Sequence, residues 1–196
     1  MRIAGLVMGT VLAVGCGATH PAPASPAPAH GSPRYAVRCL PSQLRLAAGP
    51  RIPERTQQDT LLIVVRNVSA SGCDVRGYPG IALYDGGGAR LAFSYRRQGD
   101  QMLASLPPAV VALPPGGAAY SALNKNTCAA FERRIATRVT VTIPGDRGPV
   151  VLRLPRYPIL GYCDPGDPGH TIDIAPFRAT MAGLLRTSGV STRSAR

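Results

Sequence analysis

The side chains in this chain that could perform chemistry are five cysteines and one histidine that lies close to three aspartates. His170 follows Asp164 and Asp167 in a loop rich in proline and glycine, and Asp173 comes three residues later. A histidine beside carboxylates could act as a base, and the carboxylates could converge on a cation. The spacing matches no EF-hand, and aspartate beside proline and glycine is typical of turns. We expect turn chemistry here, with an envelope enzyme or cation-dependent factor using the Asp164–His170 loop as the alternative.

Other catalytic and cofactor-binding patterns are not found in the sequence. There is no phosphate-binding G-x-x-x-x-G-K motif and no serine in a G-x-S-x-G context. The Asp-Gly-Gly-Gly run at 85–88 lies between two apolar segments and is typical of a hairpin tip, not of a dinucleotide-binding loop. We therefore expect that the protein is not an enzyme, that it has no catalytic residues, and that it uses no metal and no cofactor.

Four of the cysteines form an even set in the part of the chain expected to fold: Cys39, Cys73, Cys128 and Cys163. In an exported protein this predicts two disulfides, and the absence of a C-x-x-C pair argues against zinc or thioredoxin-like chemistry. Three pairings are possible, and the sequence does not select one. Pairing of sequence neighbours would close two loops of similar length, each contributing about 3–4 kcal/mol.

The fifth cysteine, Cys16, lies directly after an apolar segment that begins with Met1 and Arg2. The apolar run is too short to cross a bilayer, which predicts a signal peptide over residues 1–15. The tetrapeptide at 13–16 (AVGC) resembles a bacterial lipobox, and the resemblance implies acylation of Cys16. Ala13 stands where a lipobox usually has leucine. We expect a lipid anchor at the outer face of the cell membrane, with a secreted protein as the alternative.

A proline- and alanine-rich segment follows the anchor cysteine. Such composition favours polyproline II structure and disfavours packing, so residues 16–34 are expected to form the anchor and a stalk. The folded domain is expected over 35–178, followed by a C-terminal tail at 179–196.

The chain has 196 residues and a formal net charge of +12, which arises almost entirely from arginine. Such a charge favours contact with anionic surfaces. The expected partners are the lipid bilayer, through acylated Cys16, and an anionic envelope polymer or a protein. Nucleic acid is not an expected partner, because the chain has an export signal and no tryptophan, and no predicted helix concentrates the arginines.

The elements that must position these residues are mostly short strands separated by proline and glycine turns. The segment 59–68 is continuously aliphatic and is expected to be a central strand. Further strands are expected at 80–84, 90–95, 109–113, 118–123, 138–143, 150–154 and 171–175, with short helices at 126–134 and 181–186. Many short strands with regular turns indicate an all-β fold, and we expect an Ig-like antiparallel β-sandwich with two disulfides.

The run from Arg66 to Gly80 (RNVSASGCDVRGYPG) is the most distinctive stretch. With the Cys39-Leu40 start, the later Pro-Gly-Gly turn and Cys128, it resembles the actinobacterial domain of unknown function catalogued as family 4232, over about residues 35–175. The resemblance implies an exported, often lipidated β-sandwich with disulfides, and no activity. We therefore expect a non-catalytic cell-envelope lipoprotein that presents a disulfide-stapled binding or scaffold domain.

Overall fold

The computed structural model describes residues 35, 37–52, 57–129 and 134–186, and this part of the chain is all-β. Two short 3-10 turns, η1 (Pro41–Gln43) and η2 (Pro168–His170), accompany the strands. The strands are β1 (Leu44–Ala48), β2 (Gln58–Asn67), β3 (Cys73–Arg76), β4 (Gly80–Asp85), β5 (Arg90–Leu91), β6 (Ser94–Arg96), β7 (Val110–Leu113), β8 (Ala118–Asn126), β9 (Arg134–Thr142), β10 (Pro149–Arg153), β11 (Gly161–Tyr162) and β12 (Thr171–Ile174).

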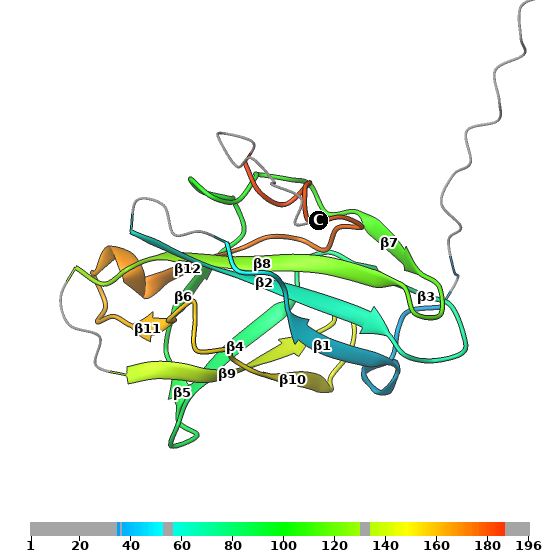
Figure 1. The fold of residues 1–196 in the computed structure, drawn as a ribbon, viewed down its shortest axis with the longest axis horizontal. Helices are drawn as coiled ribbons and strands as arrows, with labels where there is room; N and C mark the ends of the chain where they lie inside the picture. The colour runs from blue at the N-terminus through cyan, green and yellow to red at the C-terminus, as the bar shows by residue number, and fades with distance from the viewer. Residues whose placement is uncertain (1–34, 36, 53–56, 130–133, 187–196) are drawn as a thin grey trace, which may run out of the picture. The chain divides into compact units, whose positions relative to one another are not determined.

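The described strands form two large sheets and a small ribbon. The first sheet has the order β1-β2-β8-β12-β6, and the second has the order β10-β9-β4-β5, with β11 also paired to β9. Figure 1 shows β2 and β8 in one layer and β4, β9 and β10 in the other. The ribbon joins β3 to β7. One pair departs from the expected antiparallel sandwich: β6 and β12 run parallel, because the chain crosses from one sheet to the other after β5.

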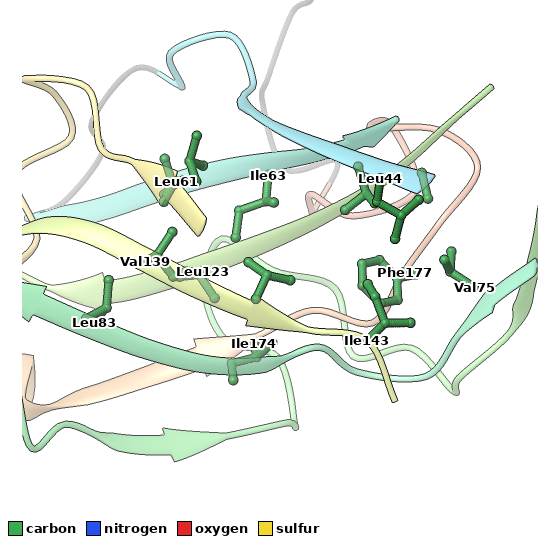
Figure 2. Close-up of a cluster of buried hydrophobic side chains, with 14 of the residues drawn as sticks. Leu44, Leu61, Ile63, Val75, Leu83, Leu123, Val139, Ile143, Ile174 and Phe177 are labelled. Carbon is green, nitrogen blue, oxygen red and sulfur yellow. The ribbon is translucent and has the colours of Figure 1, made fainter. Parts of the chain in front are cut away.

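The hydrophobic core lies between the two sheets. Alternate residues of β2 and β8, including Leu61, Ile63 and Leu123, point inward and are buried. Val139 and Leu83 come from the second sheet and join the same cluster (Figure 2). Since side chains alternate between the faces of a strand, these inward positions also determine which residues of β4 and β9 face outward.

Most of the predicted strands are confirmed, and the all-β class is confirmed with them. The aliphatic segment is a central strand, β2, flanked by β1 and β8. The segment 90–95 is not one strand, because it divides into β5 and β6 in different sheets. The two expected helices are wrong in their described parts. In the segment 126–134 the chain leaves β8 and enters β9, and in the segment 181–186 it forms a turn. The strands β1, β3 and β11 were not predicted from the sequence.

The predicted signal peptide, Cys16 and the stalk at 16–34 lie outside the described residues, as does 187–196 of the predicted tail. Within the described ranges, no helix has the length and apolar character needed to cross a membrane.

Candidate functional site: a basic groove at Tyr78

The predicted Asp164–His170 loop forms a tight turn beside the second disulfide. Asp167 precedes η2, and its carboxylate accepts hydrogen bonds from the backbone N–H groups of Gly169 (2.7 Å) and Ala129 (3.0 Å). This is the arrangement by which an N-cap residue satisfies amides at the start of a helical turn. The carboxylate of Asp167 therefore holds two segments of backbone together.

His170 also contacts the residues around it. Its Nδ1 lies 2.9 Å from the carbonyl oxygen of Cys163, and since a carbonyl only accepts, Nδ1 donates this bond. The imidazole packs edge-on against Tyr162, with ring centroids 5.6 Å apart. Asp173 lies in β12, where it pairs with Arg96 at 2.6 Å. Across the described ranges, no three His, Cys, Asp or Glu side chains lie together as metal ligands, so the three aspartates of the alternative hypothesis do not converge.

The two disulfides join sequence neighbours, which is one of the three pairings left open by the sequence. Cys39 is bonded to Cys73 and Cys128 to Cys163, with Cα–Cα distances of 4.8 and 5.5 Å. The first disulfide ties the segment before η1 to β3, and the second ties the end of β8 to the segment before η2. Both are cross-links within the fold.

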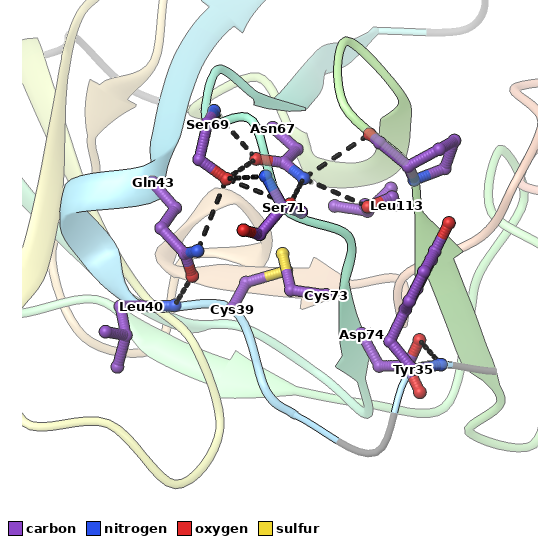
Figure 3. Close-up of a disulfide and its surroundings, with 11 residues drawn as sticks. Tyr35, Cys39, Leu40, Gln43, Asn67, Ser69, Ser71, Cys73, Asp74 and Leu113 are labelled. Carbon is purple, nitrogen blue, oxygen red and sulfur yellow. Dashed lines mark hydrogen bonds between the residues drawn. A yellow bond between two sulfur atoms is a disulfide. The ribbon is translucent and has the colours of Figure 1, made fainter.

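Asn67 organises the region next to the first disulfide (Figure 3). Its side-chain amide donates to the carbonyl oxygens of Ser71 (2.8 Å) and Leu113 (3.0 Å), while its Oδ1 accepts from the backbone N–H and the hydroxyl of Ser69. Asn67 is fully buried at the end of β2. It therefore links β2, the loop before β3 and the end of β7, and its role is structural.

A buried polar network around Asn124 was not predicted from the sequence. Asn124 of β8 accepts a hydrogen bond from Thr60 (2.6 Å) and donates to Gln58 (2.5 Å) and Asp100 (2.6 Å). A cavity of about 120 Å³ beside it is lined in part by Gln58, Asp100 and Asp173. Burial raises the pKa of Asp173 above the ordinary value of a carboxyl group, although its hydrogen bond and ion pair with Arg96 act in the opposite direction.

A groove of about 480 Å³ lies beside the Tyr78-Pro79-Gly80 motif. We call it the Tyr78 groove. Its lining includes Arg76, Tyr78, Gly80, Arg97, Thr142 and Asp146. The turn after β3 forms one wall and the end of β9 forms another.

The motif residues build this groove through backbone geometry. Gly77 has a φ of +82°, a conformation that glycine adopts without steric cost and that other residues rarely adopt. Its carbonyl oxygen accepts a bond from the N–H of Phe177, a core residue. The hydroxyl of Tyr78 lies 3.0 Å from the carbonyl oxygen of Arg97 and 2.9 Å from that of Leu106, so it can donate to either. These bonds hold three separate segments around the groove.

The groove offers cationic and aromatic groups to a ligand. The side chains of Arg76 and Arg97 are exposed, and the Arg97 guanidinium lies 5.5 Å from the centroid of the Tyr78 ring. Within the described ranges neither arginine forms an ion pair, and Asp146 is the acidic residue of the lining. Guanidinium groups bind carboxylates and phosphates through paired hydrogen bonds. The sequence predicted a turn at Tyr78, but no local pattern marked Arg76 and Arg97 as binding residues. The net charge was the one signal that pointed to arginine.

Comparison with known proteins identifies the family. Residues 39–180 match the family described as "Domain of unknown function (DUF4232)", which covers most of the domain expected from the sequence. The comparisons with curated proteins and with solved structures give no match. The match includes both disulfides, Asn67 and the Tyr78 groove. The chain therefore belongs to the DUF4232 family.

Proposed function

We propose that this protein is a non-catalytic domain of the cell envelope, held at the outer face of the membrane by acylated Cys16, and that it binds an envelope component through the Tyr78 groove. The observation that carries this proposal is the groove itself, in which two exposed arginines and Tyr78 lie on a rigid, disulfide-linked β framework. The leader and the lipobox-like tetrapeptide support the location. The positive net charge supports an anionic partner.

The geometry of the Asp164–His170 loop supports a structural role better than a catalytic one. The Asp167 carboxylate binds two backbone amides, and the Nδ1 of His170 faces a carbonyl oxygen. In the neutral imidazole this bond leaves Nε2 as the acceptor, but the Asp167 carboxylate is engaged by backbone amides and that of Asp173 by Arg96. Turnover in a broad hydrolase screen that is abolished by His170→Ala would contradict the non-catalytic proposal.

Site-specific crosslinking in the host tests the proposed site. A photo-crosslinking amino acid at Asp146, in the groove lining, is expected to capture an envelope component. The same group at Arg45, an exposed position of the other sheet, provides the control and is expected not to capture it. Arg76→Gln combined with Arg97→Gln should reduce capture at Asp146. Equal capture from both positions, or capture unaffected by the double substitution, would argue against the groove.

The anchor is tested separately by intact mass. We expect the mature chain to begin at Cys16 with attached acyl groups and to contain two disulfides. Cys16→Ser should release the protein from the membrane, because it removes the thiol that would carry the lipid anchor. An unmodified Cys16 in the mature protein would favour the secreted alternative.

A further inference from the structure

Three arginines and a tyrosine form one row across the second sheet. Arg153 of β10 is paired with Arg138 of β9, Arg138 with Tyr84 of β4, and Tyr84 with Arg90 of β5. Residues that are directly paired in antiparallel strands project from the same face. Their neighbours Leu83, Leu91, Val139 and Leu152 are buried in the core, so the row, which we call the arginine row, lies on the outer face.

The row brings like charges together on neighbouring strands. Like charges directly opposite each other in a sheet are destabilising, and Arg153 lies directly opposite Arg138. Asp85, the acidic residue that follows Tyr84 in β4, is engaged elsewhere: its carboxylate lies 3.5 Å from Arg134 and accepts a bond from the N–H of Ala89. The positive charge of the row is therefore available to an anionic ligand.

The central arginine of the row is held in place before any ligand binds. The Arg138 guanidinium lies 4.5 Å from the centroid of the Tyr84 ring, and its Nη2 donates to the carbonyl oxygen of Gly88 at 3.5 Å. Arg138 is half-buried, whereas Arg90 and Arg153 are exposed. A group that is already ordered loses less conformational entropy when a ligand binds.

An uncharged path joins the arginine row to the Tyr78 groove. Gly80 and Thr142 are directly paired and both line the groove. The next outward pair is Ala82 with Thr140, and the one after it is Tyr84 with Arg138. From Gly80 to Tyr84 the path is about 13 Å long at the usual rise of a strand. Positive charge therefore lies at both ends of an uncharged path of small residues.

We propose that this face binds a linear phosphodiester polymer, which lies along β4 and β9 from the Tyr78 groove to the arginine row. The inference rests on the proposed function and names its ligand class. Arginine binds phosphate oxygens through paired hydrogen bonds, and two cationic regions joined by an uncharged path along β4 and β9 match a charged chain better than a plane of lipid headgroups. Thr140 lies between the two ends; its hydroxyl donates to the carbonyl oxygen of Ala82 at 3.4 Å and can still accept a hydrogen bond from the uncharged linkers of such a polymer.

Binding of synthetic poly(glycerol phosphate) to the full chain tests this proposal. All forms carry Cys16→Ser, so that no acyl chain contributes. Combined Arg90→Gln, Arg138→Gln and Arg153→Gln is expected to weaken binding at least about tenfold. It should also lower the slope of log K against log salt by up to about 2, if each lost contact counts about 0.7, as in single-stranded nucleic acids. The matched control is Arg45→Gln with Arg66→Gln, an exposed cross-strand arginine pair on the other sheet. It should leave the affinity nearly unchanged.

Several results would overturn the proposal: unchanged binding by the triple variant, equal loss in the control variant, or equal affinity for polyglutamate. Loss of binding to anionic phospholipid vesicles, with polymer binding retained, would assign the row to a membrane surface instead. If the triple variant binds normally while the Arg76 and Arg97 substitutions still abolish crosslinking from Asp146, the proposed function stands and this inference fails. If both sets of substitutions are without effect, both proposals fail.

Discussion

The ammonium group of Lys125 lies 3.8 Å from the carboxylate of Asp59, at directly paired positions of β8 and β2. Both side chains are buried, and that of Lys125 has no exposed surface. Transfer of two charges from water into a protein interior costs several kcal/mol per ion, and their attraction offsets this cost only in good geometry. The only lysine of an arginine-rich chain is therefore an interior residue rather than part of its basic surface.

Lys125→Met should destabilise the protein by about 3–5 kcal/mol, because the Asp59 carboxylate stays buried without the ammonium group. Urea unfolding measures the loss. Combined Lys125→Met and Asp59→Leu should recover most of it, since the pair is then replaced by apolar groups of similar volume. A double variant as unstable as the single one would show that the ion pair itself is not the cause.

Asn67→Ala should lower the free energy of unfolding by about 3 kcal/mol, since it leaves the buried carbonyl oxygen of Leu113 without this donor. The matched control is Ser69→Ala, which removes a hydroxyl that is only half-buried. We expect the control to cost about 1 kcal/mol or less. Equal losses in urea unfolding would contradict the central role assigned to Asn67.

Gly169→Ala tests whether the Asp164–His170 loop is built for packing. A Cβ at this position would lie 2.5 Å from the Sγ of Cys163 and 2.6 Å from the carbonyl oxygen of Asn126, so the loop must shift. We expect a loss of about 1–3 kcal/mol, the usual range for overpacking. Gly86→Ala, where the nearest atom is 3.8 Å away, should change the melting temperature little.

The stability difference between wild type and Asp173→Asn should depend on pH. Burial raises the pKa of Asp173, so the folded state holds the proton more tightly than the unfolded state. The stabilisation that this proton gives to the folded state is fully present below the ordinary aspartate pKa of about 3.9. It is lost as the pH rises through the raised pKa of the folded state. In urea unfolding at a series of pH values, the free energy of unfolding of wild type should therefore rise relative to that of the variant as pH falls. The opposite trend would mean that the pair with Arg96 outweighs burial.

The two disulfides should contribute equally to stability but differ in accessibility. Their sequence separations, 34 and 35, predict about 4 kcal/mol each in the chain-entropy model. Cys39 and Cys73 are fully buried, whereas Cys128 is half-buried. Mild reduction followed by alkylation and mass analysis should therefore modify Cys128 and Cys163 first. Preferential labelling of Cys39 would contradict this order.

The sequence alone determined the features that depend on neighbouring residues. Alternating and aliphatic segments predicted the all-β class, and the central strand β2 was identified because its continuous apolar run fits burial on both faces. Glycine and proline marked the hairpin between β4 and β5 and the turn between β9 and β10. An even set of four cysteines predicted two disulfides. Each signal lies within a short window, so it can be recognised without knowledge of the rest of the chain.

Only the tertiary structure decided the features that depend on contacts between distant segments. The disulfide pairing, the burial of Lys125 against Asp59, and the division of 90–95 between two sheets all follow from which strands become neighbours. The arginine row shows the reason most directly: Arg90, Arg138 and Arg153 are far apart in sequence and align only through the register of four strands. A shift of one residue in any pair would turn a side chain to the other face, so periodicity alone cannot locate the row.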